Sequence, residues 1–385
     1  MSKIWWVKQD QLNDSQLEVI AIAGKGRGFV LTGPPGSGKT NLLMLVCAAM
    51  KTRGFDNAKV IVFTTALREF ISAGLATYKL DADVVETLSK AARSIAREHG
   101  DKLPVDVNFL TLQTAWRNCF TSYTAPQSRV QRIYDALLID ESQDFNREEV
   151  AVMFGSSGYT VFSIDINQST YERTDAKHPV LSLQEESNLP LHSLTVHYRV
   201  GRRICRFADL LMEGRLGYQN MEENSMYKEK DRPSLIDYEN YNGQPELEYE
   251  KIVGRSTNQL AVYPTERIGI LFPKNDQVAA FRKYCELNHP GYFENESFDA
   301  EGLRAQLFIG TMHEAKGLEF AVVHIAGQEK LSVFATQKTL LFTAVTRARY
   351  ACYITASGKV PLYLTSAYHR LDGPKGISSS SLFPE

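Results

Sequence analysis

A glycine-rich stretch, VLTGPPGSGKTNLLM, at residues 30–44 restricts the possible folds of this chain more than any other segment. Its core, GPPGSGKT at residues 33–40, fits the pattern G-x-x-x-x-G-K-[ST] without a mismatch. The pattern follows an apolar run typical of a buried strand and opens a segment with helical periodicity, which is the context that such a phosphate-binding loop needs. The sequence therefore predicts a site for the phosphates of a nucleotide.

The residue types in this loop suit a crowded, negatively charged ligand. Gly36 and Gly38 lack a Cβ atom, so backbone N–H groups can approach phosphate oxygens closely. We expect Lys39 to reach the β- and γ-phosphates and the Thr40 hydroxyl to bind Mg²⁺, while the helix that begins near Lys39 adds its positive dipole end. The residues expected to contact the nucleotide here are Gly33, Pro34, Pro35, Gly36, Ser37, Gly38, Lys39, Thr40 and Asn41.

A second motif supplies groups that hydrolysis would need. The sequence ALLIDESQD contains an apolar run at residues 136–139 that ends in Asp140 and Glu141. A carboxylate at the end of a strand can hold Mg²⁺ opposite Thr40, and its neighbour can orient or deprotonate the attacking water. We therefore expect Thr40 and Asp140 to be metal ligands and Glu141 to be a catalytic carboxylate.

Short apolar runs alternate with helical segments along most of the chain. One such series lies between residues 29 and 165, and a second lies between residues 267 and 355. This alternation is typical of α/β folds with doubly wound parallel sheets. We expect two tandem domains, at residues 1–178 and 179–385.

Three segments fall outside the alternation. We expect a small helical insertion at about residues 95–130, a polar connection with one or two edge strands at about residues 214–253, and a frayed tail at about residues 373–385.

Composition narrows the class of protein. Apolar residues make up 43% of the chain and charged residues 23%, which is typical of soluble globular proteins. No apolar run approaches the ~20 residues of a membrane-spanning helix, and the start of the chain lacks a secretory signal, so we expect a cytoplasmic protein without a membrane partner. The five cysteines are scattered, which argues against a disulfide framework or a structural zinc site. A net charge of −2 argues against an architectural DNA binder, but leaves room for an enzyme with a local basic groove.

An ordered set of motifs resembles the superfamily 1 helicases of the UvrD/Rep type. The resemblance covers nearly the whole chain, although Ile164 stands where the family prefers glycine. The matching segments are LNDSQ (12–16), GPPGSGKT (33–40), DESQD (140–144), SIDINQSTY (163–171), VHYRV (196–200), TMHEAKGLEF (311–320) and FTAVTRAR (342–349).

The resemblance implies roles for individual residues. Gln16 would read adenine, Tyr198 would stack on it, and Glu319 would serve the ribose. Arg199 would reach the γ-phosphate and Arg347 would act as an arginine finger. The catalytic residues expected from all motifs together are Lys39, Asp140, Glu141, Gln168, Arg199 and Arg347. Because the two arginines and the phosphate loop lie in different halves of the chain, a nucleotide that contacts all of them would sit in a cleft between the domains.

Candidates for nucleic-acid contacts match the family less closely. The family usually continues after its third motif with a tryptophan that stacks on a base, whereas this chain has Arg173. An arginine plane can stack on a base and contact phosphate; the alternative is a solvated surface charge. The candidates are Thr64, Thr65, Thr87, Tyr171, Arg173, Thr311 and His313.

The resemblance implies two RecA-like P-loop NTPase domains, ATP and Mg²⁺ as cofactors, and a motor that moves 3′ to 5′ on single-stranded DNA. The chain leaves no room for the second large insertion of full-length family members, so we expect a compact motor that unwinds duplex with a partner or only translocates. A nuclease, as in antiviral defence systems, would be one such partner. RNA stays an alternative substrate. A nucleic-acid-sensing ATPase switch, which licenses a partner without processive movement, stays an alternative function.

Overall fold

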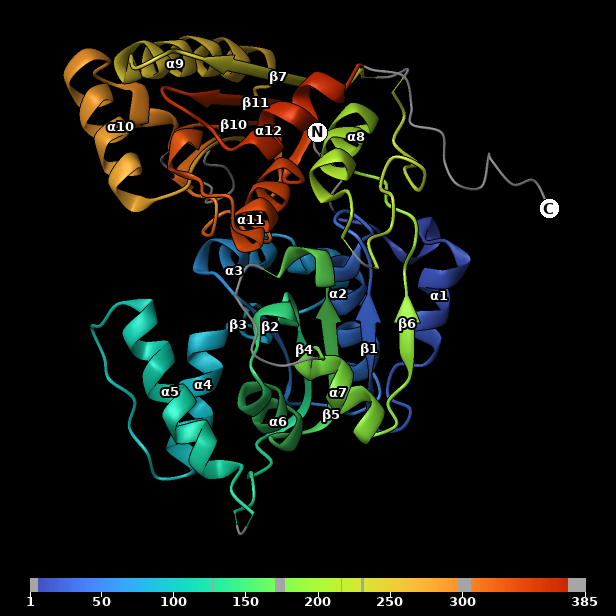
Figure 1. Ribbon diagram of the computed structural model, residues 1–385. Coiled ribbons are helices and arrows are strands. Elements are labelled where there is room, and N and C mark those ends of the chain that lie inside the picture. The colour runs from blue at the N-terminus through green and yellow to red at the C-terminus, as the bar shows by residue number, and fades with distance from the viewer. Residues whose placement is uncertain are drawn as a thin grey trace.

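The computed structural model describes residues 6–126, 128–169, 177–215, 217–229, 232–296 and 306–372. These residues form two α/β lobes, each built on a sheet whose strands are all parallel (Figure 1). The expected fold class of two tandem RecA-like domains with parallel sheets is confirmed.

The sheet of the first lobe has the strand order β3-β2-β4-β5-β1-β6. Its strands are β1 (Gly28–Thr32), β2 (Ala58–Val62), β3 (Val85–Thr87), β4 (Tyr134–Ile139), β5 (Ser157–Ile164) and β6 (Leu191–Ser193). One face is covered by α1 (Asp14–Ala21), α2 (Lys39–Lys51) and α3 (Thr65–Ser72). The other face is covered by α4 (Leu88–Glu98), α5 (Phe109–Tyr123), α6 (Arg147–Gly155) and α7 (Pro179–Glu186).

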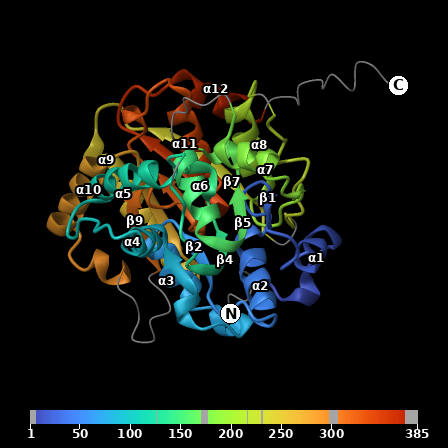
Figure 2. The ribbon, with the colours of Figure 1, turned by 90° about the horizontal axis from the view of Figure 1, so that it is seen from below.

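The two faces follow from the alternation of side chains along each strand. In β1, Leu31 packs in the core that contains Leu42 of α2, whereas its neighbour Val30 packs in the core that contains Trp116 of α5 and Val150 of α6. Figure 2 shows the resulting sandwich, with α1, α2 and α3 on one side of the strands and α6 and α7 on the other. Because both faces are buried, the strands have the continuous apolar sequences that the alternation predicted.

The sheet of the second lobe has the strand order β7-β11-β10-β8-β9. Its strands are β7 (Leu235–Asn240), β8 (Ile268–Phe272), β9 (Leu307–Thr311), β10 (Phe320–Ile325) and β11 (Ala348–Ala356). On one face lie α8 (Arg202–Met212), α11 (Ala335–Val345) and α12 (Leu362–Arg370), and on the other lie α9 (Pro245–Val262) and α10 (Asn275–Asn288). This lobe is therefore doubly wound as well.

The division between the lobes differs from the expected one after residue 178. β6 pairs with β1 in the first sheet, and α7 contacts β1, whereas α8 packs on β7 and β11 of the second sheet. The short strand β6 has half-exposed and exposed residues, so no apolar run marked it as part of a sheet. We therefore propose a boundary between β6 and α8.

The smaller segments also differ in part from expectation. The helical insertion expected at about residues 95–130 contains the end of α4 and the whole of α5, whereas the connection expected at about residues 214–253 contains β7 and the first half of α9. That helix begins with Pro245 and an acidic first turn, which are helix-start features rather than features of a loop. The expected tail at residues 373–385 lies outside the described residues.

The strands of the first sheet end toward the second lobe, as the arrows of β1 and β6 show in Figure 1. Arg215, which follows α8, ties the lobes together: its guanidinium donates to the carbonyl of Ile166 at 2.9 Å and to the hydroxyl of Thr339 at 2.9 Å. Within the described residues, no helix combines the length and the apolar character needed to span a bilayer.

Candidate functional site

A cleft of about 1010 Å³ lies between the two lobes. It collects most of the residues that the motifs singled out, from both halves of the chain. Those that line it are Gln16, Pro35, Gly36, Gly38, Lys39, Thr40, Asn41, Asp140, Glu141, Gln168, Tyr198, Arg199, Glu319 and Arg347. Gly33, Pro34 and Ser37 belong to the same loop but do not line the cleft.

The glycine-rich loop runs from the end of β1 into the first turn of α2. Gly36 has φ +77°, and a Cβ atom there would lie 2.9 Å from the Cβ of Arg199. Both the left-handed backbone and the close approach of the second lobe's connecting segment therefore require glycine. The Lys39 ammonium donates to the carbonyl oxygens of Gly33 at 2.7 Å and Pro34 at 3.1 Å, so it lies within the curve of the loop.

The side chains of Thr40 and Asp140, which lie 100 residues apart in sequence, are in contact next to this loop. The Thr40 hydroxyl donates to Asp140 Oδ2 at 2.6 Å, and Ser163 donates to Oδ1 at 3.0 Å. Burial, with the neighbouring charge of Glu141, raises the pKa of the Asp140 carboxyl. A buried carboxylate that is costly to ionise gains from a nearby cation, and hydroxyl and carboxylate oxygens are the donors that Mg²⁺ prefers.

These two side chains fit the way in which proteins usually hold Mg²⁺, through one or two groups together with substrate phosphates. The described residues contain no cluster of three or more His, Cys, Asp or Glu side chains that could form a complete protein cage. The pair Thr40 and Asp140 therefore suits a metal that arrives with a nucleotide.

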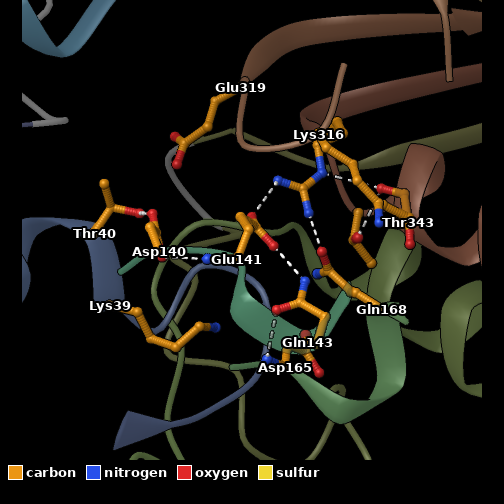
Figure 3. Close-up of polar contacts among 12 residues, drawn as sticks. Lys39, Thr40, Asp140, Glu141, Gln143, Asp165, Gln168, Lys316, Glu319 and Thr343 are labelled. Carbon is orange, nitrogen blue, oxygen red and sulfur yellow. Dashed lines mark hydrogen bonds and ion pairs between the residues drawn. The ribbon is translucent and has the colours of Figure 1, made fainter. Parts of the chain in front are cut away.

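Glu141 lies beside Asp140 in a left-handed backbone conformation, with φ 52°. This turn points its carboxylate into the cleft, where it accepts from the Gln143 amide and lies 3.9 Å from Arg347 (Figure 3). Burial alone would raise the pKa of Glu141, but the positive charges of Arg347 and Lys39 outweigh burial and lower the pKa. The carboxylate is thus kept ionised and able to accept a proton or to orient water.

Arg347 reaches this group from the second lobe. The residue is 3% exposed and lies at the end of α11, where its Nε donates to the Thr343 carbonyl at 3.1 Å. Its Nη2 donates to the side-chain oxygen of Gln168, in the 3₁₀ turn η5 (Ile166–Gln168) that follows β5. One arginine of the second lobe therefore contacts two expected catalytic residues of the first.

The other expected arginine is also fixed by the second lobe. Arg199 forms an ion pair with Glu319 and donates to the Thr346 carbonyl at 3.1 Å. Since Arg199 and Glu319 both line the cleft, a ligand could contact either of them. Their mutual ion pair was not expected from the sequence, because 120 residues separate them.

A further part of the cleft wall is formed by Gln16, near the start of α1, and by Tyr198. The Gln16 amide donates to the Ser37 carbonyl at 3.0 Å and accepts from the backbone of Asn13 at 3.1 Å, which closes a capping box at the helix start. Asn13 donates to the Tyr198 hydroxyl at 2.5 Å, and Tyr198 is 44% exposed. Gln16 thus supports the phosphate loop directly, while its expected contact with adenine stays a prediction.

Two comparisons with known proteins bear on this arrangement. Residues 306–355 match the UvrD-like helicase C-terminal domain. The match covers the second-lobe segment from β9 into β11, including Glu319 and Arg347.

The structure of the PRRSV helicase overlaps 90% of this chain and 57% of its own chain, at 14% sequence identity and a TM-score of 0.41. This chain thus spans little more than half the length of that helicase, and a likeness at this score carries no argument about function. No curated protein matches the sequence.

Residues 306–355, called the UvrD-like segment below, also contain two of the nucleic-acid candidates. Thr311 ends β9, and its hydroxyl donates to Glu314 at 2.9 Å. His313 lies in the turn that follows, where burial and the charge of Lys316 lower its pKa to about 4, so the ring is neutral at physiological pH. Tyr171 and Arg173 lie outside the described residues.

In the first lobe, Thr64 follows β2 and Thr87 is the last residue of the adjacent parallel strand β3, so they lie at the same edge of the sheet. Each acts as a helix cap: Thr64 accepts from the Leu67 backbone at 3.1 Å and Thr87 from the Lys90 backbone at 3.3 Å. Thr65, the first residue of α3, is exposed. A contact of these threonines with nucleic acid stays a prediction.

The sequence motifs also contain a pair whose importance was missed. Lys316 of the UvrD-like segment forms a buried ion pair with Asp144, the last residue of DESQD. Both positions belong to motifs that had been recognised, but only the fold shows that they meet. Asn41 also makes contacts that the sequence did not predict. Its side-chain oxygen accepts hydrogen bonds from the Val7 backbone at 3.3 Å and from the Tyr78 hydroxyl.

Proposed function

We propose that this chain is an ATP-dependent motor that moves 3′ to 5′ on single-stranded DNA. The observation that carries the proposal is the convergence of Arg347 from the second lobe on Gln168 and Glu141 of the first, within a cleft that the phosphate loop also lines. A nucleotide in that cleft would touch both lobes, so its hydrolysis could change how they fit together.

The chemistry would follow from the order of groups along the cleft. The loop and Lys39 would bind the triphosphate, and Thr40 and Asp140 would hold Mg²⁺, which neutralises phosphate charge when bound. Glu141, kept ionised by its positive neighbours, would orient the attacking water and accept its proton. Arg347 and Arg199 would stabilise the charge that develops on the transferred phosphate.

Movement would require two binding sites for the same nucleic-acid strand, one on each lobe. The first lobe would hold the strand at the ends of β2 and β3, through Thr64, Thr65 and Thr87, and the second lobe would hold it after β9, through Thr311 and His313. Closing and opening of the cleft would change the distance between these two strand-binding sites. The contact of α11 with η5 supports this coupling, because Arg347 follows the last residue of α11 by two positions.

The decisive test is steady-state ATP hydrolysis with Mg²⁺, without polymer and with single-stranded DNA, duplex DNA or RNA. Lys39→Ala serves as the blank, and Lys25→Ala, an exposed lysine of the same lobe, as the matched control. We expect stimulation by single-stranded DNA that grows with strand length to a plateau. Rates that are equal with and without every polymer would contradict the proposal.

Displacement of streptavidin from end-labelled oligonucleotides separates movement from mere sensing. Faster release from one end of the strand is expected of a translocating motor, and release from the 5′ end would support 3′ to 5′ movement. ATP hydrolysis stimulated by DNA without any displacement would favour a switch that licenses a partner, such as a nuclease.

A further inference from the structure

The cleft is also lined by segments that carry no helicase motif. From the first lobe come Trp6, Val7 and Gln11, which precede α1. From the second lobe come Tyr227, Arg232 and Tyr350. A nucleotide whose triphosphate lies on the loop places its base outside the loop, so the base can contact this additional part of the cleft wall.

Trp6 is held there by a built aromatic pocket. Its ring stacks on Phe70 of α3 with centroids 5.7 Å apart and planes inclined by 23°, and it meets Tyr78 edge-on at 5.9 Å. A Cβ atom at Gly74 would lie 1.9 Å from the indole ring, so only glycine leaves room for the tryptophan. The ring is therefore a fixed part of the cleft wall.

The position of this wall is linked to the phosphate site. Asn41 accepts a hydrogen bond from the Val7 backbone at 3.3 Å and another from Tyr78, which contacts the indole. Asn41 follows Thr40 directly in the first turn of α2, and it is 8% exposed. The aromatic wall is thus held at a set distance from the residue expected to bind the metal.

We propose that Trp6 forms an aromatic contact surface for the nucleobase, so that the segment of Trp6 to Gln11 makes the cleft selective for nucleosides over bare phosphates. This inference rests on the proposed nucleotide site and adds a base-binding residue to it. A planar base gains from an aromatic wall by stacking or edge contact. The opposing view is that Trp6 only fills the space over Gly74 and stabilises the lobe.

Binding measurements with two ligands distinguish these views. Isothermal titration calorimetry would compare the Kd of a non-hydrolysable ATP analogue, adenosine 5′-(β,γ-imido)triphosphate, with the Kd of inorganic tripolyphosphate, both in the presence of Mg²⁺. We expect Trp6→Leu to raise the Kd of the nucleotide analogue about tenfold, a typical loss for one aromatic–base contact, and to leave the Kd of tripolyphosphate unchanged. Trp6→Phe, which retains an aromatic ring, should stay within about threefold of the unaltered protein.

Each other outcome has a separate meaning. An unchanged Kd for the nucleotide analogue in Trp6→Leu would overturn the proposal. An equal loss of affinity for both ligands, together with a lower Tm, would also overturn it, because it would show a structural role for Trp6. Failure of the unaltered protein to bind either ligand would instead overturn the nucleotide site itself. Lys39→Ala is the reference for that case, because this substitution should weaken the binding of both ligands.

Discussion

Lys316 of the second lobe and Asp144 of the first form an ion pair whose side chains are 2% and 1% exposed. The pair bridges the two lobes, and Asp144 lies three residues after Glu141 in the sequence. Two charges removed from water are stable only when they compensate each other. The interface between the lobes therefore depends on both partners together.

Removal of one partner should be more harmful than removal of both. We expect Lys316→Met or Asp144→Asn alone to lower the free energy of unfolding by about 3–5 kcal/mol, because each leaves an uncompensated buried group. The double variant should recover part of this loss. Urea denaturation of the four proteins gives the coupling energy, and a double variant whose loss equals the sum of the single losses would show that the pair is not coupled.

Glu141→Gln should separate binding from hydrolysis. The amide retains the shape of the carboxylate but cannot accept a proton, so we expect unchanged affinity for ATP and a kcat reduced by about 10²–10⁴-fold. The lowered pKa of Glu141 adds a pH criterion: protonation of Glu141 itself should not reduce kcat until the pH drops below the usual glutamate value of 4.5. Full activity in Glu141→Gln would show that another group handles the water.

Arg347→Ala should also retain ATP binding while losing turnover. An arginine that stabilises the transferred phosphate in the transition state typically contributes about 10³-fold or more to kcat. Arg347→Lys should not restore the rate, since an ammonium lacks the planar fork that contacts Gln168. The exposed Arg370→Ala in α12 is a suitable control. Turnover close to normal in Arg347→Ala would remove Arg347 from the catalytic set.

His197, buried next to Tyr198, should make stability depend on pH. Burial lowers its pKa from 6.5 to about 4. As pH falls from about 6.5 to about 4, the unfolded chain binds a proton that the folded protein does not, so folding stability decreases over this window, by up to about 3 kcal/mol for this group. Urea denaturation at pH 7 and pH 5 measures the effect. A pH dependence that is unchanged in His197→Gln would show that other groups cause it.

The phosphate loop, the strand before it and the helix after it could be predicted because they are local. Residues 28–51 contain the buried strand, the glycines of the turn and the helix start in one continuous segment. The same holds for Asp140 and Glu141, which follow directly from the apolar run of β4. Adjacent residues specify these elements, so the sequence pattern was sufficient for their geometry.

Elements without a local pattern were missed or misplaced. β6 joins the first sheet through pairing with β1 although its side chains are largely exposed, and its place depends on the neighbouring strand rather than on its own composition. The helix α9 was hidden by its acidic start, because charge suggested a connection while the buried face, with Ile252, Val253 and Leu260, follows only from packing on the second sheet.

The motifs alone predict the chemical groups of the proposed nucleotide site: the phosphate loop, the paired carboxylates and the arginines of the later motifs. Which of these groups meet follows from the fold. Arg347 contacts Gln168 across 179 positions, Lys316 contacts Asp144 across 172, and the Asn41 side chain accepts hydrogen bonds from Val7 and Tyr78. Local propensities fix strands, turns and helix starts, whereas contacts between distant segments arise from the packing of helices on each sheet and of the two lobes against each other.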